Sequence, residues 1–340
     1  MVRTVGIVDI AREAGCSINT VSRALNDMPG VSAGAKARVL AAAERLHYTP
    51  SRVARSLLAS STKTLGLVVT DCTNPFYARA IRAVEDFAFA RDYSVILCNS
   101  GEDYQREMRA IRMLLESRVD GILITPVQGP YEHIAELLDR RIPFVLVGRR
   151  FEMLDTPYVT SDNVGGARTA VSHLLSLGHR VVGHVTGRQE ISSVAERLAG
   201  FCQALQEHGL PLDSALVVRG ERDVEGGLAC ARQLLACRPR PTAIFAYNDL
   251  QALGVLRAAR ELRLRVPEEL AVVGFDDIEL SAFFEVPLTT IAQPTYELGR
   301  RAVEMLFQLM HDPLSAKDRQ VILHPELIVR SSSALAVHST

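Results

Sequence analysis

Residues 9–26 read Asp9-Ile-Ala-Arg-Glu-Ala-Gly-Cys-Ser-Ile-Asn-Thr-Val-Ser-Arg-Ala-Leu-Asn26, and this stretch predicts two short helices joined by a sharp turn. The first helix, residues 8–14, places its apolar side chains along one side. Gly15 and Cys16 can supply the turn, and Ser17 is suited to cap a second helix that ends at residue 24 or 25. A helix, a turn containing glycine and a second helix within about 20 residues form the pattern of a helix-turn-helix.

A third helix is expected to complete this first domain. Ser32 can cap its start, and the helix should end before Pro50, because the residue before a proline disfavours the helical conformation. Its apolar positions recur at a spacing of three and four residues: Val39, Leu40, Ala43 and Leu46. Since the first sixty residues show no strand pattern, residues 1–50 predict a small all-α domain.

The basic residues of the chain are concentrated in this first part. Residues 1–63 contain nine Lys and Arg against four Asp and Glu, a net charge of +5, whereas the rest of the chain carries −6 and the whole chain −1. A basic domain on a mildly acidic body suggests that the domain meets a polyanion and the body does not. The alternative is a solvated helix face that is basic without such a partner.

The second predicted helix exposes side chains that suit the major groove of DNA. Arg23 can bond guanine with both arms of its guanidinium, Asn19 can match adenine, and Ile18 can touch the methyl group of thymine. The hydroxyl side chains expected to bond phosphate oxygens are Ser17, Thr20 and Ser22. Taken alone, the pattern also fits a three-helix packing module with a polar surface.

From residue 65 onward, apolar strand-like runs alternate with amphipathic helical stretches. The predicted strands are residues 65–70, 95–98, 121–125, 144–148, 181–186, 243–246 and 270–274. The helices between them include residues 78–92, 105–117, 164–177, 195–208 and 249–262. Runs that are apolar on both faces predict parallel sheets covered by helices on both sides. Because the series begins afresh near residue 162, we expect two Rossmann-like subdomains with a ligand cleft beyond the carboxyl ends of their strands.

Composition excludes several classes of protein. With 340 residues, 48% of them hydrophobic, the chain can bury large cores and is not disordered. No apolar run approaches the ~18–20 residues of a membrane span, and Asp9 interrupts the N-terminus before the apolar region of a signal peptide can form. The six cysteines show no CxxC pair, so we expect reduced and mostly buried thiols in a cytoplasmic protein without a membrane partner.

The sequence gives no support for catalysis or metal binding. The phosphate-binding pattern GxxxxGK[ST], the zinc pattern HExxH and the dinucleotide pattern GxGxxG are missing. The nine histidines show no metal-ligand spacing. We therefore expect no catalytic residue, no metal and no cofactor.

Residues 9–26, together with Val31-Ser32 and Leu46-His-Tyr-Thr-Pro-Ser-Arg-Val-Ala-Arg-Ser-Leu57, resemble the LacI/GalR family of transcriptional regulators. The resemblance runs over nearly the whole chain, through segments such as 159–167, 195–201 and 273–277. It implies a helix-turn-helix domain followed by an α/β core of two subdomains, similar to type I periplasmic sugar-binding proteins. It also implies a repressor that binds a near-palindromic operator as a homodimer and responds to a small effector, expected to be a carbohydrate, in the core cleft.

The resemblance further implies a hinge helix after the first domain. In the family this helix forms when two subunits meet on an operator, with the residue matching Leu57 wedged into the minor groove. Residues 51–58 are too few for a helix that is stable alone, which agrees with that requirement. The DNA contacts expected here are Pro50, Ser51, Ala54, Arg55 and Leu57, although Leu57 could instead belong to the core of the body.

One departure from the family lies in the first turn of the third helix. Relatives usually carry polar or charged residues there, often a Thr-Arg pair, where this chain has Ala33-Gly-Ala-Lys36. Gly34 should weaken the helix by ~0.5–1 kcal/mol relative to alanine. Ala35 cannot bond a phosphate, so we expect Lys36 to make that contact.

The resemblance also locates an effector site, for which the expected residues are Phe76, Tyr77, Arg149, Asp162, Arg197, Asn248 and Asp276. Arg197 can bond two neighbouring hydroxyls, and Asp276 can accept hydrogen bonds from two more. Phe76 and Tyr77 can form an aromatic wall for the apolar face of a sugar.

Plainer roles compete for several of these residues. Arg197 could form a salt bridge at a surface or between domains, and Arg149, although suited to an acidic or phosphorylated ligand, could be solvated. Asp162 could cap the helix that follows it, and Asp277 could replace Asp276 as the effector carboxylate. Asp249 is expected to cap a helix rather than to bind ligand.

The expected domains are residues 1–50 for the helix-turn-helix, 51–63 for the hinge and linker, 64–161 with about 292–322 for one subdomain, 162–291 with about 323–331 for the other, and 332–340 for a short tail. The ten residues after Arg330 are too few for a tetramerising coiled coil, so we expect a dimer, with Val84, Phe87 and Ala88 as candidates for its surface. Two other classes remain open. A transport-linked sugar-binding protein would need an export signal and no basic head, and an enzyme would act on a sugar in the same cleft.

Overall fold

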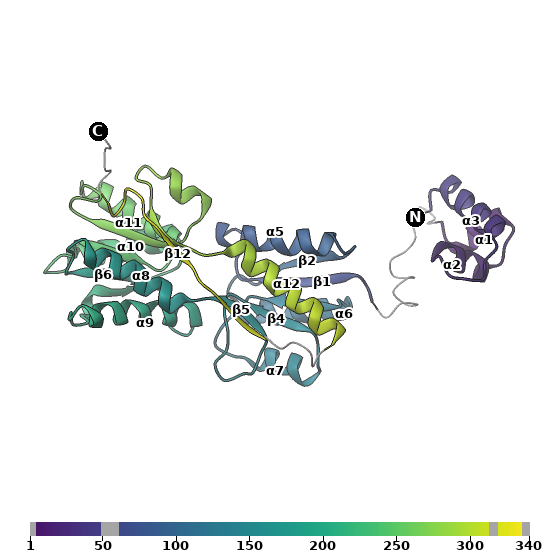
Figure 1. The fold of residues 1–340 in the computed structure, drawn as a ribbon, viewed down its shortest axis with the longest axis horizontal. Helices are drawn as coiled ribbons and strands as arrows, with labels where there is room; N and C mark the ends of the chain where they lie inside the picture. The colour runs from purple at the N-terminus through teal and green to yellow at the C-terminus, as the bar shows by residue number, and fades with distance from the viewer. Residues whose placement is uncertain (1–4, 49–60, 313–318, 335–340) are drawn as a thin grey trace. The chain divides into compact units, whose positions relative to one another are not determined.

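The computed structural model describes residues 5–48, 61–312 and 319–334. The chain divides into two compact units, Met1–Thr62 and Lys63–Thr340, which we call the head and the body. The described part of the head is helical, and the body contains two α/β lobes (Figure 1).

The head contains helices α1 (Ile7–Ala14), α2 (Ile18–Leu25) and α3 (Ala33–Arg45). Between α1 and α2, Gly15 adopts the left-handed conformation (φ 60°, ψ 40°), which strains residues that carry a side chain. Ser17 caps α2, since its hydroxyl accepts a hydrogen bond from the backbone N–H of Thr20 at 3.1 Å. These features confirm the predicted helix-turn-helix.

Small aliphatic side chains fill the space between the three helices: Ile10, Ala11, Ala14, Val21, Ala24, Val39, Ala42 and Ala43. The prediction that Leu40 belongs to this core is wrong, because Leu40 is 48% exposed. One step along an α-helix turns the side chain by about 100°, so Leu40 leaves the face that Val39 buries. Ala42 and Ala43 occupy the buried face instead.

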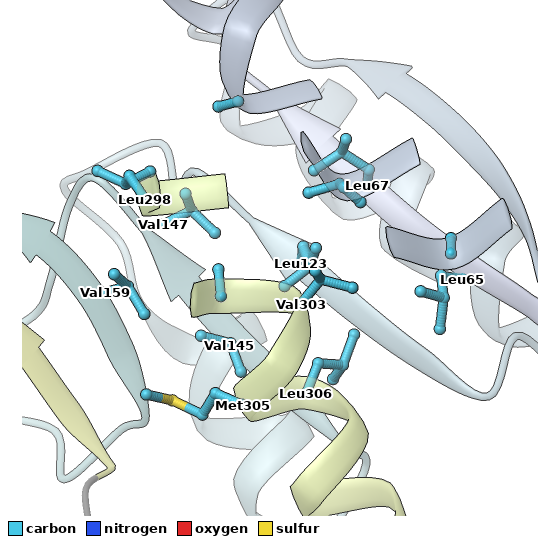
Figure 2. Close-up of a cluster of buried hydrophobic side chains, with 14 of the residues drawn as sticks. Leu65, Leu67, Leu123, Val145, Val147, Val159, Leu298, Val303, Met305 and Leu306 are labelled. Atoms are coloured by element: carbon cyan, nitrogen blue, oxygen red, sulfur yellow. The ribbon is translucent and has the colours of Figure 1, made fainter. Parts of the chain in front are cut away.

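The first lobe of the body, here called the N-lobe, contains a six-stranded parallel sheet. Its strand order is β11 (Gln320–Leu323), β5 (Tyr158–Ser161), β4 (Phe144–Val147), β3 (Gly121–Ile124), β1 (Thr64–Val69) and β2 (Ser94–Asn99). Helices α5 (Pro75–Phe89) and α12 (Thr295–His311) cover one face, and α6 (Tyr104–Glu116) and α7 (Glu132–Asp139) cover the other. Figure 2 shows side chains of the strands, such as Leu65, Leu123 and Val145, facing Val303 and Leu306 of α12.

The second lobe, here called the C-lobe, repeats this architecture. Its strand order is β12 (Glu326–Ile328), β10 (Thr289–Ala292), β9 (Ala271–Asp276), β8 (Ala243–Ala246), β6 (Val182–Thr186) and β7 (Val217–Arg219), with β12 antiparallel to β10 and the other pairs parallel. Helices α8 (Asn163–Ser176) and α9 (Ser192–Glu207) cover one face, and α10 (Val224–Ala236) and α11 (Asp249–Glu261) cover the other (Figure 1).

Both sheets share one order of their first five strands. It is β2-β1-β3-β4-β5 in the N-lobe and β7-β6-β8-β9-β10 in the C-lobe. In this order the loops after the two central strands run to opposite sides, which leaves a crevice beyond the carboxyl ends of the strands. The chain passes between the lobes after β5, after β10 and between β11 and β12, so the two crevices belong to one body. The structure thus confirms two subdomains with mainly parallel sheets, which follow the helical head in the sequence.

The candidates for the dimer surface on α5 are corrected by the structure. Val84 and Ala88 are buried against α12 of their own lobe, with exposures of 2% and 0%. Phe87 is half-buried and packs edge to face on Phe307, with ring centroids 5.4 Å apart. Val84 and Ala88 are therefore not available to a partner subunit, whereas Phe89 at the end of α5 is 84% exposed.

Two smaller expectations also differ from the structure. All six cysteines are free, but only Cys230 is buried and Cys72 is exposed, so the prediction of mostly buried thiols is wrong. Ser332 belongs to the C-lobe rather than to a tail, because its buried hydroxyl donates to the carbonyl oxygen of Val272 at 2.6 Å. No helix among the described residues is both long and apolar enough to cross a bilayer.

Candidate functional site

Helix α2 of the head presents the side chains that were predicted to read DNA. Those that are exposed or half-buried on it and at its cap are Ser17, Ile18, Asn19, Thr20, Ser22 and Arg23. Val21 and Ala24 are buried against the other helices, so the polar and apolar sides of α2 are separated. The structure brings the predicted set together on one helix, and its contacts with DNA stay a prediction.

Two of the basic side chains predicted to contact DNA are engaged within the head itself. Arg23 donates a hydrogen bond from Nη2 to the carbonyl oxygen of Pro29, in the loop before α3. Lys36, the expected phosphate contact, is ion-paired with Asp27. Exposed contacts of this kind contribute little to stability, so phosphates or bases of DNA could replace them.

The expected hinge contacts Pro50, Ser51, Ala54, Arg55 and Leu57 lie outside the residues that the structure describes. Their role on DNA stays a prediction.

In the body, residues that follow the strands of both lobes enclose a cleft of about 230 Å³. The cleft is lined by Thr70, Asp71, Asn74, Phe76, Tyr77, Gly101, Glu102, Thr125, Gly148 and Arg149 of the N-lobe and by Ser193, Arg197, Glu221, Arg222, Asp223, Tyr247, Asn248, Asp276 and Gln293 of the C-lobe. All residues predicted for the effector site except Asp162 belong to this set. The volume is below the ~300–1,000 Å³ of pockets for drug-sized ligands, so the cleft suits a molecule of monosaccharide size.

Arg197 reaches the cleft from α9 and is held on several sides. Its Nε donates to Oδ1 of Asn163 at 3.0 Å, and its Nη1 donates to the carbonyl oxygen of Tyr247 at 2.6 Å. Its guanidinium lies 3.6 Å from the centre of the Phe275 ring, a favourable cation–π contact. Because Arg197 is only 4% exposed, the alternative of a surface salt bridge is wrong.

Asp276 lies at the end of β9 with a backbone φ of 123°, a region that residues with side chains rarely adopt. Its Oδ1 accepts a hydrogen bond from Nε2 of Gln293 at 2.7 Å. Burial raises the pKa of its carboxyl to about 6, although Arg197 and Gln293 act in the opposite direction. Asp277 is instead ion-paired with Arg330 at 2.8 Å and does not line the cleft. The structure thus places Asp276 in the cleft.

A charged cluster joins the two lobes at the cleft. Arg149, which follows β4, donates from its two terminal nitrogens to the carboxylate of Glu102 at 2.6 and 3.0 Å. Arg222, which follows β7 of the C-lobe, is ion-paired with the same carboxylate. Burial favours a raised pKa for Glu102, but hydrogen bonds and charges of the two arginines outweigh it and lower the pKa to about 2. Arg149 is 3% exposed, so the alternative of a solvated side chain is wrong.

Aromatic rings border the cleft from both lobes. Phe76 and Tyr77 begin α5, and their rings meet edge to face with centroids 5.0 Å apart. The Tyr77 hydroxyl is hydrogen-bonded to Thr70 at 2.8 Å, and that of Tyr247 to Ser193 at 2.9 Å. The predicted aromatic wall therefore lines the cleft, and Tyr247 adds a ring that the sequence analysis missed.

Asn248 lines the cleft but already makes two bonds within the protein. Its Oδ1 accepts from the backbone N–H of Gln251 at 2.8 Å, which caps α11, and its Nδ2 donates to the carbonyl oxygen of Arg222 at 3.0 Å. The prediction that Asp249 caps this helix is wrong, because Asp249 is buried and accepts from Thr290 Oγ1 at 2.5 Å. Asn248 thus holds the loop of Arg222 in place.

Asp162 does not line the cleft. Its Oδ1 accepts a hydrogen bond from the backbone N–H of Gly165 at 2.8 Å, so it caps α8. Asp162 was expected in the effector site or, alternatively, as the cap of the following helix, and the structure supports the second of these.

Sequence reasoning missed Glu102 and Arg222. Glu102 follows a predicted strand, so the rule that cleft residues follow strands could have found it. Arg222 follows β7, which has only three residues, and the apolar run at residues 215–218 is the signal that could have indicated this strand.

One segment of the head matches a hydrolase pattern without the geometry for that chemistry. Residues 30–34, Gly-Val-Ser-Ala-Gly, have the spacing GxSxG, which marks a nucleophile only at a turn between a strand and a helix. Ser32 is the exposed cap of α3 and accepts a hydrogen bond from the backbone N–H of Ala35 at 3.3 Å. In the described ranges, no group of three or more His, Cys, Asp and Glu side chains is arranged to hold a metal ion.

Comparison with known proteins covers both units of the chain. Residues 6–51 match the family described as "Bacterial regulatory proteins, lacI family", and residues 171–333 match a periplasmic binding protein-like domain. The HTH-type transcriptional repressor PurR of Photobacterium profundum is 36% identical over 329 residues, which cover 96% of this chain and 98% of that protein.

Solved structures give similar results. The lac repressor dimer bound to operator and the anti-inducer ONPF matches with a TM-score of 0.86 at 28% identity, covering 97% of this chain and 99% of the other. A complex of the transcriptional regulator CelR with cellobiose matches with a TM-score of 0.75 at 30% identity, covering 97% and 100%.

Proposed function

This chain belongs to the lacI family of bacterial regulatory proteins, and we propose that it is a transcriptional repressor whose affinity for DNA is set by a small molecule in the cleft of its body. Like its relatives, it is a DNA-binding regulator and not an enzyme. The observation that carries the proposal is the combination, in one chain, of a basic helix-turn-helix with a polar cleft between two lobes.

The head supplies the contacts with operator DNA. Arg23, Asn19 and Ile18 read base edges in the major groove, while the hydroxyl side chains of α2 and Lys36 hold phosphates. The hinge inserts Leu57 into the minor groove when two subunits are bound. The protein binds DNA in the cytoplasm, where the bacterial chromosome lies.

A homodimer presents two equal heads to a near-palindromic operator. The lac repressor was solved as a dimer on its operator, which supports this assembly. Because Val84 and Ala88 are buried within their own lobe, the apolar side chains that are exposed, such as Phe89 at the end of α5 (84%), are better candidates for the subunit interface. These include Leu280 and Phe283 of the C-lobe, which are 58% and 79% exposed.

A carbohydrate or a carbohydrate derivative is the proposed effector. Arg197 and Asp276 offer donors and acceptors for hydroxyls, and Phe76, Tyr77 and Tyr247 offer apolar ring surface. The cellobiose complex of CelR supports a sugar as the ligand of a similar structure.

The effector controls the head through the arrangement of the two lobes. Contacts across the lobes include the ion pair of Arg150 with Glu196 at 2.9 Å and the bond from the backbone N–H of Ser192 to Oε1 of Gln128 at 2.6 Å. A ligand that favours one arrangement must make or break such contacts. It can shift the equilibrium only by its difference in affinity for the two arrangements, a coupling of typically ~1–3 kcal/mol.

The test begins with selection of duplexes from a random library by the full chain, followed by a thermal-shift screen of sugars, sugar acids, sugar phosphates and purines. We expect a symmetric duplex whose affinity falls steeply with salt and changes when a stabilising ligand is added. A protein that enriches no duplex and still binds a sugar would instead be a binding protein or a sugar-processing enzyme.

A further inference from the structure

The cleft contains more buried positive charge than buried negative charge. Three guanidiniums line it, those of Arg149, Arg197 and Arg222. In the described part of the chain, the carboxylates within 4 Å of them are those of Glu102 and Asp276. Arg149 and Arg222 share the carboxylate of Glu102, so the two carboxylates offset two of the three positive charges and leave the cluster with one positive charge in excess.

The other acidic residues of the lining do not change this balance in the interior. Asp71 is half-exposed, and its Oδ1 accepts bonds from the backbone and the hydroxyl of Thr73 at 2.9 and 2.6 Å. Asp223 is exposed and caps α10, and Glu221 is exposed. Solvent and salt screen charges at such positions far more than charges inside the cleft.

The Tyr247 hydroxyl reports the sign of the potential inside the cleft. Burial acts to raise the pKa of this phenol, yet the charges of Arg197, Arg222 and Arg149 outweigh it and hold the pKa below its usual value. The hydrogen bond to Ser193 acts in the same direction, whereas burial raises the pKa of Tyr77 on the N-lobe side of the cleft. The arginines therefore make the potential positive close to Tyr247, which favours an anion at that place.

Glu102 occupies the position that a ligand anion would need. Its carboxylate fills the fork of Arg149 in the N-lobe and also pairs with Arg222 in the C-lobe. Two parallel bonds from one guanidinium match the geometry of a carboxylate or a phosphate, and an anion also restores the charge that Glu102 supplies. A neutral hydroxyl restores neither the geometry nor the charge, so an anion displaces Glu102 more readily than a neutral sugar does.

Resting on the proposed function, we propose that the effector is an anionic, polyhydroxylated small molecule whose carboxylate or phosphate replaces Glu102 on Arg149 and Arg222. Its hydroxyls then bond Arg197 and Asp276. Because Arg149 and Arg222 belong to different lobes, the ligand anion bridges the lobes in place of Glu102. Glu102 acts as a tethered competitor that keeps the site occupied until the effector arrives.

The test compares matched pairs of probes on the full-length protein by calorimetry and thermal shift. Gluconate is compared with glucose, and ribose 5-phosphate with ribose. We expect an anionic probe to bind at least about tenfold more tightly than its neutral partner, since charge-assisted bonds replace neutral ones. Glu102→Gln should strengthen the binding of that anion by about tenfold and leave the neutral sugars within about threefold, because it removes only the competing charge. The two pairs separate a carboxylate ligand from a phosphate ligand.

Two further variants guard against indirect effects. Glu196→Gln breaks another ion pair between the lobes, that with Arg150, outside the cleft lining, and should leave the preference for anions unchanged. Arg222→Gln, at a side chain that is 22% exposed, should remove most of the preference.

Three results would overturn this inference. They are equal binding of the neutral and anionic probes, weaker binding of the anion by Glu102→Gln, and binding of no anion by either protein. The proposed function has a separate readout, which is salt-sensitive binding of the selected duplex. A protein that binds this duplex and responds only to neutral ligands would retain the proposed function and contradict the inference.

Discussion

Nη1 of Arg197 lies 3.6 Å from Oδ1 of Asp276, with both side chains less than one-tenth exposed between the two lobes. This distance is too long for a hydrogen bond, so the pair attract each other without exhausting their donors and acceptors. A hydroxyl group can therefore bond both at once.

Asp276→Asn should abolish the response to the cleft ligand and leave binding to DNA intact. Loss of the negative charge weakens the bonds to ligand hydroxyls by ~1.5–3 kcal/mol, about tenfold or more in affinity. Asp277→Asn is the matched control, because Asp277 pairs with Arg330 outside the cleft. Calorimetry measures the ligand affinity and fluorescence anisotropy the DNA affinity. A normal ligand response in Asp276→Asn would remove Asp276 from the site.

Arg23→Ala should relax the base preference of the head and cost ~1–3 kcal/mol on the best duplex. The matched control is Arg45→Ala, which removes an exposed, positively charged side chain at the end of α3. Arg45 is ion-paired with Glu13 at 3.2 Å. That control should affect all duplexes alike. Competition between the selected duplex and single-base variants measures the preference, and unchanged discrimination by Arg23→Ala would exclude it as a reader.

Two glycines of the head should respond in opposite directions to alanine. A Cβ atom at Gly34 or at Gly15 would meet no atom within 4 Å, but Gly15 has a φ of +60°. Gly34→Ala should stabilise the head by ~0.5–1 kcal/mol, because glycine loses more conformational freedom in a helix. Gly15→Ala should destabilise it by ~1–2 kcal/mol through the left-handed backbone. Amide hydrogen exchange of α3 in the full chain checks both, and stabilisation by Gly15→Ala would contradict the observed turn.

His184 should make the body less stable in acid. The ring stacks between Phe201 and Phe245, with centroids 5.0 Å from each, and burial lowers its pKa to about 4. The pKa of this histidine is near 6.5 in the unfolded chain and about 4 in the folded one, so between these pH values only the unfolded chain binds the proton. The contribution of the neutral, buried His184 ring to the free energy of unfolding is therefore complete above pH 6.5 and is lost as the pH falls. The loss amounts to about 3 kcal/mol near pH 4. Denaturant titrations of wild type and His184→Phe from pH 7 to 4 measure it, and equal pH dependence would contradict the assignment.

The head could be predicted from sequence because its signals are local. As predicted, Gly15 forms the turn after α1, Ser17 caps α2 and Ser32 caps α3. Leu40 is the exception, since a spacing of three or four residues does not decide which neighbour at the edge of an apolar face is buried. The alternation of strands and helices in the body could also be predicted from the sequence.

The missed features of the body depend on tertiary packing. Val84 and Ala88 form an apolar face that, in sequence, looks the same whether it covers a partner or its own lobe. The missed strands lack the fully apolar, fully buried runs of β3, β4 and β8: β5 and β10 contain Thr or Ser, and β7, β11 and β12 are partly exposed strands at sheet edges. Glu102 and Arg222 meet only because the lobes face each other. Apart from the start of the tail, which Ser332 corrects, the domain boundaries stay predictions, as do the hinge contacts.

The central claim is that occupation of the cleft sets the affinity of the head for DNA. The most direct measurement is the affinity of the full chain for its selected duplex over a range of salt concentrations, with and without the ligand that stabilises the body. The account predicts that the logarithm of the affinity falls with that of salt concentration with a slope steeper than about −4, and that the ligand changes the affinity at least about fivefold in wild type and not in Asp276→Asn. A flat salt dependence, or a ligand that binds the cleft and leaves DNA affinity unchanged at every salt concentration, would contradict it.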